Sequence, residues 1–280
     1  MKVTLLGTGS PIPDPRRAGP STLVRTDGAI ILVDCGRGVL MRLTAAGVLP
    51  PMLSGVLVTH LHSDHITDLN DVITTHWVMA PEGTPLRVWG PPRIREVVDG
   101  ILASLAPDIQ YRLDHHDDLT WRPNVVVTEV APGDEFACGS ASVQVGATDH
   151  RPVEPTVSFR VNDGGRSVVL GGDGVPCVGL DQLCLGADAY VQTVIRDDIV
   201  RMIPNARIQD ILDYHSTVEQ AAEPELGGAV GRRETIAAPT TALEEVLHLF
   251  DHSCPHSRSR DGRRNRGVML QFMTIGASEA

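Results

Sequence analysis

Short hydrophobic runs recur along the first 222 residues and alternate with turns that are rich in Gly, Pro and Asp. Runs that are enriched in Val, Ile and Leu and bounded by turn residues predict β-strands. The expected strands are Lys2–Leu6, Ser21–Arg25, Ala29–Val33, Gly55–Thr59, Leu86–Trp89, Val125–Glu129, Val143–Gly146, Thr156–Val161 and Ser167–Leu170. Because these runs are apolar almost throughout, we expect the strands to be buried on both faces.

Segments with helical spacing of apolar residues lie between these strands. They are Gly38–Ala46, Ile66–Met79, Arg93–Leu105 and Asp181–Leu185. At 280 residues and 42% hydrophobic, the chain is long enough for one sizeable core or for two closely joined halves. The pattern predicts an α/β fold in which two sheets pack together and helices cover their outer faces.

The pattern changes near Glu223. The chain then carries Gly, Arg, Ser and Pro without core periodicity, and only Thr241–Phe250 has the spacing of a helix. We therefore predict one folded domain over residues 1–222 and a divergent, partly disordered segment over 223–280. The basic run Ser257–Arg266 fits a solvated tail, with a nucleic-acid-binding arm as the alternative. A shifted reading frame in a GC-rich gene would also produce this change, and translating the other frames of the coding DNA would test it.

Charge and cysteine content narrow the classes of function. The formal net charge of −11 repels nucleic-acid backbones from the general surface. No apolar run is long enough for a membrane span, and the N-terminus resembles a strand rather than a leader, so we expect a soluble, cytoplasmic protein without a membrane partner. Five cysteines without a C-x-x-C pair argue against a disulfide framework or a thiolate zinc site. A metal site would therefore depend on His and Asp.

The motif that follows the strand at Gly55 is the strongest indication of chemistry. His60, His62, Asp64 and His65 fall within six positions. Alternate residues of a strand project to the same side, and the turn that follows can bring the later two residues behind the first two. Imidazole nitrogens and carboxylate oxygens suit zinc, with manganese or iron as alternatives. The competing interpretation is a solvated, His-rich turn.

Further ligand-type residues stand at the ends of other predicted strands. Asp34 follows Ala29–Val33, His150 follows Val143–Gly146, and Asp173 follows Ser167–Leu170. Taken singly, each would be read as a cap or turn residue. Together with the His-rich motif they predict a site for two metal ions.

These residues resemble those of the metallo-β-lactamase superfamily. Leu6–Pro11, Val33–Gly36 and Tyr214–Thr217 are similar to motifs of the branch that contains ribonuclease Z and its arylsulfatase and phosphodiesterase relatives. The resemblance implies a four-layer αββα sandwich, two zinc ions and a homodimer. By the same resemblance His60, His62 and His150 hold one zinc, Asp64 and His65 hold the other, Asp173 bridges both, Asp34 orients the metal loop through hydrogen bonds and His215 meets the phosphate.

The implied chemistry is hydrolysis by a metal-bridging hydroxide. Two cations lower the pKa of a water between them and neutralise charge on phosphate oxygens. Asp64 would align the nucleophile, and His215 would protonate the departing oxygen. The leading hypothesis is a di-zinc phosphodiesterase or ribonuclease Z-like endonuclease that acts on RNA 3′ ends or small diesters. The alternatives are an arylsulfatase or other small-ester hydrolase, and a non-catalytic or weakly active metal-binding paralogue.

The chain departs from the family pattern at three places. Gly174 stands where the family carries Thr, and Gln192 stands where relatives carry His or Glu. After Ala222 no Leu-Thr-His strand supplies the last ligand of the second metal, for which His248 and His252 are candidate replacements. Without a replacement, the second ion would be held weakly by Asp64, His65 and Asp173.

The spacing of the ligands bears on the substrate. Relatives that process tRNA carry an extended arm between the third metal histidine and the bridging aspartate. Here the stretch from His150 to Asp173 has room only for two strands and the turn Asn162–Gly165. Without an arm, and with a negative net charge, hydrolysis of a small ester fits better than tight gripping of tRNA.

Overall fold

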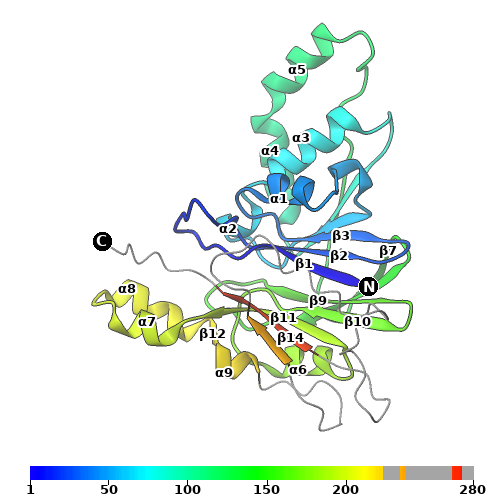
Figure 1. Ribbon diagram of the computed structural model, residues 1–280. Helices are drawn as coiled ribbons and strands as arrows, with labels where there is room; N and C mark the ends of the chain where they lie inside the picture. Colours follow the sequence, from blue (N-terminus) through cyan, green and yellow to red (C-terminus); the bar gives the residue numbers. More distant parts are fainter. Residues whose placement is uncertain (223–233, 238–266, 273–280) are drawn as a thin grey trace.

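The computed structural model describes residues 1–222, 234–237 and 267–272. Two β-sheets face each other, and helices lie on the outer side of each sheet (Figure 1). The predicted four-layer αββα arrangement is thereby confirmed.

The first sheet is formed by the N-terminal half of the chain. Its strands, in spatial order, are β1 (Lys2–Gly7), β2 (Ser21–Arg25), β3 (Ile30–Val33), β4 (Gly55–Leu57), β5 (Leu86–Gly90) and β6 (Val125–Glu129). The first three strands pair antiparallel, and the strands from β3 to β6 pair parallel. The carboxyl ends of the parallel strands therefore meet at one edge of the sheet.

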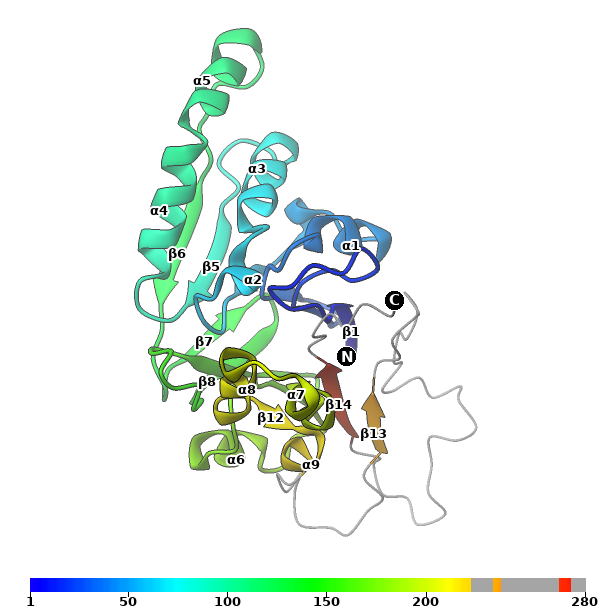
Figure 2. The same cartoon turned by 90° about the vertical axis from the view of Figure 1, so that its left-hand side faces the viewer.

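The helices of this half connect the parallel strands. They are α1 (Val39–Ala45), η1 (Pro50–Met52), α2 (Ser63–Ile66), α3 (Leu69–Met79), α4 (Ile94–Ser104) and α5 (Ala106–His115). Helices α4 and α5 follow each other upward and carry the chain away from the sheets (Figure 2). The helix predicted over Ile66–Met79 is present as α3 from Leu69 onward, but its start differs, because the chain turns at Thr67–Asp68, where the Asp68 amide donates to the Cys35 carbonyl at 2.9 Å.

The second sheet contains the remaining strands. Its spatial order is β13 (Glu234–Ala237), β14 (Gly267–Phe272), β11 (Ala189–Ile195), β10 (Arg166–Leu170), β9 (Val157–Asp163), β8 (Ala141–Ala147) and β7 (Glu135–Cys138), and β12 (Ser216–Thr217) pairs with β11. Its helical segments are α6 (Val178–Cys184), α7 (Asp197–Met202), α8 (Ala206–Gln209), η2 (Asp210–Asp213) and α9 (Val218–Ala221). None of the helices in the described ranges combines the length and apolarity that crossing a membrane requires.

The C-terminal segment contributes to this second sheet. Strand β14 pairs parallel with β11, and β13 pairs parallel with β14. The sequence pattern did not predict these two strands. The predicted helix Thr241–Phe250 lies outside the described residues, and so do the candidate ligands His248 and His252.

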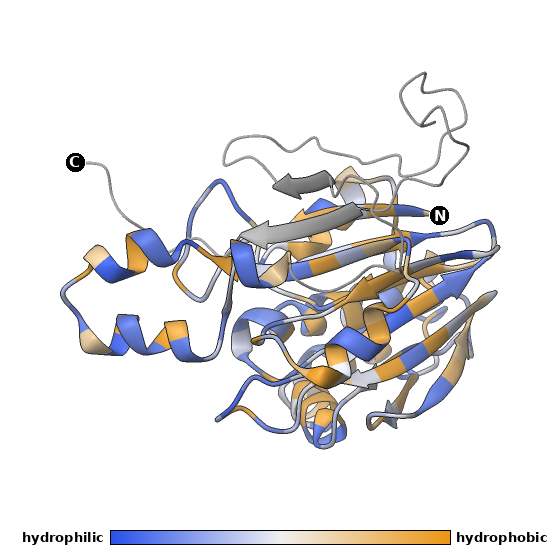
Figure 3. Ribbon diagram, turned by 90° about the horizontal axis from the view of Figure 1, so that it is seen from below, coloured by the Kyte–Doolittle hydropathy of each residue, from blue (hydrophilic) through white to orange (hydrophobic). Residues whose placement is uncertain are grey.

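Three hydrophobic layers hold the fold together. Alternate residues of one strand face different layers: Ile31 and Val33 of β3 pack between the two sheets, whereas Leu32 packs against the helices of the first half. Seen from below, orange and blue segments alternate along the helices, which pack one side on a sheet and expose the other (Figure 3). On the second sheet, Val169 and Tyr190 pack against α6. Burial on both faces explains why these strands are apolar almost throughout.

The layer between the sheets should carry much of the folding free energy. Phe159 in β9 is 0% exposed in that layer. We expect Phe159→Ala to lower the free energy of unfolding by about 3–5 kcal/mol, because the truncation leaves a cavity between two packed sheets. Denaturant unfolding measures the change. Val126→Ala, on the outward side of β6, is the control and should change it by roughly 0.5 kcal/mol or less; equal effects of the two variants would contradict this account of the core.

Candidate metal centre

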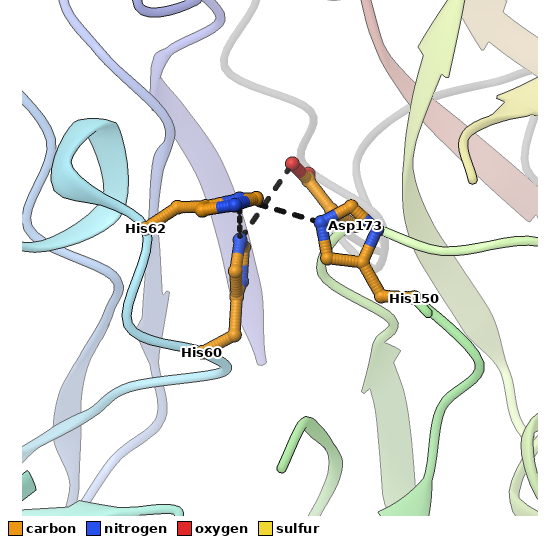
Figure 4. A group of neighbouring side chains, drawn as sticks. All are labelled: His60, His62, His150 and Asp173. Atoms are coloured by element: carbon orange, nitrogen blue, oxygen red, sulfur yellow. Dashed lines mark hydrogen bonds and ion pairs between the residues drawn. The ribbon is translucent and has the colours of Figure 1, made fainter. Parts of the chain in front are cut away.

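The predicted ligands come together at one edge of the two sheets. His60 and His62 follow β4, His150 follows β8, and Asp173 follows β10 (Figure 4). One ligand atom from each of these four residues lies within 4.8 Å of the other three. The ligands come from both sheets, so the site exists only when the sheets are packed together.

Backbone hydrogen bonds tie the ligand loops to one another. The Val157 amide donates to the Thr59 carbonyl at 2.9 Å, which joins β9 to the loop that precedes His60. The Val175 amide donates to the Asp149 carbonyl at 2.8 Å, which joins the loops of Asp173 and His150. The spacing between ligands is therefore set by the backbone.

Two histidines of the cluster, His60 and His150, are each oriented by a bond to the ring nitrogen that faces away from it. His60 Nδ1 lies 3.0 Å from Thr59 Oγ1, and His150 Nδ1 donates to the Tyr214 carbonyl at 2.8 Å. Their Nε2 atoms are left to face His62 Nδ1 at 3.1 and 3.4 Å. Bonds of this kind fix which nitrogen is available to a metal.

The surroundings keep these rings neutral, as metal ligation requires. Burial lowers the pKa of His150 to about 4 and the pKa of His60 well below its ordinary value. Burial also lowers the pKa of His62, which is the least enclosed of the three. Uncharged nitrogens that converge beside a buried carboxylate form a donor set suited to a divalent cation.

A second group of ligand-type atoms adjoins the first through Asp173. His65 Nε2 lies 3.3 Å from Asp173 Oδ2 and 3.9 Å from Asp64 Oδ2. Within the described residues, neither His65 Nε2 nor Asp173 Oδ1 has a hydrogen-bond partner, although both are buried. Since buried polar atoms are rarely left without partners, these two atoms fit a group that is absent from the protein chain itself. A cation satisfies both.

The charges of the second group support the same conclusion. Burial disfavours the ionised form of Asp173, but attraction from His65 and a hydrogen bond from His215 outweigh it and hold the pKa of Asp173 well below its usual range. Burial disfavours the charged form of His65, but Asp173 and Asp34 outweigh it and raise the pKa of His65. Burial raises the pKa of Asp64. Asp173 is thus a buried anion that requires positive charge around it.

Asp34 forms hydrogen bonds with the segment Thr59–His65, which carries four of the predicted ligands. Its carboxylate accepts the Thr59 amide at 2.8 Å, the Thr59 hydroxyl at 2.9 Å and His65 Nδ1 at 2.9 Å. Its backbone φ is +61°, a conformation that few residues other than Gly adopt. The three bonds keep the strained residue in place, and they direct His65 Nε2 toward Asp173.

The loop around Asp173 explains why Gly follows the aspartate. A Cβ at Gly174 would lie 2.6 Å from Thr148 Cγ2 and 2.8 Å from the Asp149 carbonyl oxygen, so a Thr would not fit without a shift. The Gly174 carbonyl accepts the Ser216 hydroxyl at 2.7 Å and the Ser216 amide at 2.9 Å. Ser216 therefore braces this loop, a role that the sequence pattern did not indicate.

The Gln192 side chain contacts the same loop at Gly174. It is fully buried, accepts the Tyr190 hydroxyl at 2.6 Å, and directs its amide toward the Gly174 carbonyl at 3.4 Å. Its polar atoms are thus used within the fold. The presence of Gln at position 192, where relatives carry His or Glu, changes the contacts with this loop but removes no atom from the ligand cluster.

His215 lies against the Asp173 carboxylate. Its Nδ1 donates to the Ile211 carbonyl at 3.1 Å, and its Nε2 stands 3.3 Å from Asp173 Oδ2. The neighbouring Tyr214 ring packs on His215 with ring centres 4.7 Å apart. His215 is 4% exposed, so its imidazole is held at the inner wall of the site.

The remaining histidines have other places in the fold. His76 is buried on α3, in agreement with its interpretation as a packing residue. His115 and His116 are exposed at the end of α5, and His256 lies outside the described residues.

The fold and this cluster define a metal-dependent hydrolase of the metallo-β-lactamase type. A family model described as the beta-lactamase superfamily domain matches residues 30–233. Among solved structures, the metallo-beta-lactamase fold protein YhfI from Bacillus subtilis covers 70% of this chain at 22% identity with a TM-score of 0.55, and 72% of that chain is matched.

Two further comparisons show to which family within this superfamily the chain is similar. A curated relative from Mycolicibacterium gilvum, named Ribonuclease Z, is 57% identical over 233 residues, which are 82% of this chain and 82% of the relative. The short form of human tRNase Z is 25% identical, with a TM-score of 0.60 over 79% of this chain and 86% of that one. The chain therefore belongs to the beta-lactamase superfamily and, within it, to the ribonuclease Z family.

If the hydrogen bonds of Asp34 orient the metal ligands, removing them should lower the affinity of the site for metal. In Asp34→Asn one carboxylate oxygen becomes an NH₂ group, which cannot accept the bonds from Thr59 and His65. We expect zinc affinity to fall by about 10–100-fold, measured by competition with a chelator. Asp163→Asn, at the opposite end of β9, is the matched control and should leave affinity unchanged. Wild-type affinity in Asp34→Asn would show that Asp34 does not orient the ligands.

Proposed function

We propose that this protein is a two-zinc phosphodiesterase that cleaves precursor RNA at its 3′ end. The observation that supports it best is the shared Asp173 carboxylate, which lies between the His60–His62–His150 group and the pair of Asp64 and His65. We infer the RNA substrate from the similarity to the curated relative named Ribonuclease Z. The nitrogen and carboxylate donors favour zinc over harder cations.

The proposed ligand set follows from these contacts. His60, His62, His150 and Asp173 hold one ion, and Asp64, His65 and Asp173 hold the other. Two bound ions would acidify a water and neutralise charge on the phosphate. Because His248 and His252 lie outside the described residues, the second set comprises three side chains. We therefore expect the second ion to bind more weakly than the first.

The chain's own groups have distinct roles in this proposal. Asp64, whose pKa is raised by burial, accepts a proton from the attacking water and aligns it with the phosphorus. His215 in its imidazolium form donates a proton from Nε2 to the departing ribose oxygen. The Asp173 carboxylate lies 3.3 Å from that nitrogen and holds the ring in position.

The short connection between His150 and Asp173 supports a second substrate class, small phosphodiesters. Strands β9 and β10 are joined by a tight turn at Gly164 and Gly165, so no arm projects from this part of the chain. Small diesters need no extended grip and reach the same reacting groups. The homodimer and the cytoplasmic location stay predictions, the first of which gel filtration with light scattering would test.

The metal count tests the proposed centre. Elemental analysis of the purified chain in zinc-containing buffer should give two zinc ions per chain. His62→Ala and His65→Ala, which remove ligands of different ions, should each reduce the count to about one. A wild-type chain that holds a single ion when free zinc is raised well above the affinity of the first site would overturn the two-ion proposal.

The acid role of His215 predicts a dependence on the leaving group. His215→Ala should reduce RNA cleavage by about 10²–10⁴-fold, because a ribose alkoxide needs a proton to depart. A nitrophenyl diester releases a weakly basic phenolate, so its hydrolysis should fall by much less. His116→Ala, at an exposed position on the end of α5, is the control. Equal losses on the two substrates would rule out proton donation by His215.

A further inference from the structure

We infer that the guanidinium of Arg37 binds a phosphate of the RNA backbone outside the cleavage position, so that it selects RNA over small diesters. This inference rests on the proposed function and adds a contact that the metal centre does not provide. A protein with a net charge of −11 needs a local positive surface beside the site to hold a polyanion.

Several surface arginines of the described chain form an ion pair with a nearby carboxylate. The pairs are Arg93 with Glu96, Arg112 with Asp108, Arg151 with Asp149, Arg196 with Asp198 and Arg201 with Asp197. Arg37, like Arg87, is exposed, and its side chain makes neither a hydrogen bond nor an ion pair with any described residue. Its charge is therefore available to a ligand.

The backbone at Arg37 is fixed relative to the metal loop. The Cys35 amide donates to the His65 carbonyl at 2.7 Å, and the Gly19 amide donates to the Arg37 carbonyl at 2.7 Å. A side chain at Gly36 would collide with the Asp64 carbonyl oxygen, so the two segments touch there. Arg37 thus begins one residue beyond this contact, on the Asp64 and His65 side of the site.

The neighbouring loop adds to the positive charge. In the connection between β1 and β2, Arg16 and Arg17 share a single carboxylate, Asp14, and Arg42 on α1 donates to the Arg16 carbonyl at 3.2 Å. This loop is drawn in dark blue beside α1 and α2 (Figure 2). Arg16 and Arg37 are exposed, Arg42 is partly exposed, and the Gly19–Arg37 backbone bond joins their two segments, so positive side chains gather on this part of the fold.

The position of Arg37 indicates which substrates it can contact. The backbone of Gly36 separates it from Asp64, so it lies outside the group of atoms that would meet the scissile phosphate. A small diester has no second phosphate to offer there, whereas RNA continues with one phosphate per nucleotide. A guanidinium binds phosphate oxygens through paired hydrogen bonds, which a lysine does not reproduce.

The test compares Arg37→Gln with Arg87→Gln on two substrates. Arg87 is also exposed, but it lies near the amino end of β5, away from the ligand edge. On a precursor-tRNA transcript, we expect Arg37→Gln to lower kcat/KM by about 10-fold or more and to reduce the slope of log affinity against log salt by about 0.7–0.9. Arg37→Lys should recover part of the loss. Hydrolysis of a nitrophenyl diester by Arg37→Gln, and both reactions of Arg87→Gln, should stay at the wild-type level.

Binding of a transcript that already ends at the cleavage position separates the two proposals. If the wild-type chain binds it in an Arg37-dependent manner but does not cleave the precursor, the proposed function fails and the inference about Arg37 holds. Wild-type RNA binding and cleavage by Arg37→Gln would overturn the inference alone. Equal losses by Arg37→Gln on RNA and on the nitrophenyl diester would also overturn it, since Arg37 would then act at the reacting phosphate. A wild-type chain that neither binds nor cleaves RNA would overturn both proposals.

Discussion

The buried carboxylate of Asp173 is the constraint on which the rest of the site depends. An ionised group that is 2% exposed is costly to bury unless positive charge and hydrogen-bond donors surround it. Here His65 and His215 approach one of its oxygens at 3.3 Å, and the other oxygen has no hydrogen-bond partner in the described structure. The loops that carry His60, His65 and His215 are arranged around this anion. Metal binding and proton transfer in the proposed reaction both use its charge.

Much of the fold could be predicted from short-range patterns. The apolar runs at β3 and β4 could be recognised because each strand is buried on both sides, so nearly every position must be apolar. The division between α2 and α3 was missed because it depends on a bond between Asp68 and Cys35, which are far apart in the sequence. Strands β13 and β14 were missed because their short runs lie among Gly and Arg residues that suggest a tail.

In the candidate site too, residues that are close in the sequence could be predicted, whereas residues that meet only in the folded chain could not. His60, His62, Asp64 and His65 form one motif, so their shared role is visible along the chain. Ser216 and Gly174 act together only because β12 lies beside the loop that follows β10, and no spacing rule connects them. The absence of Thr at position 174 likewise has a steric cause in Thr148, a neighbour that only the packed sheets bring near.

The ligands of the metal centre come from both sheets, and this has a consequence for the folded state. His60 and His62 extend from the first sheet, whereas His150 and Asp173 extend from the second. An ion bound by all four acts as a cross-link between the two halves of the sandwich. By mass action, its binding energy adds to the cohesion of the halves in proportion to the logarithm of ion concentration over dissociation constant. The supply of the metal ion in the cell would then affect how long each protein molecule stays folded as well as how fast it cleaves its substrate.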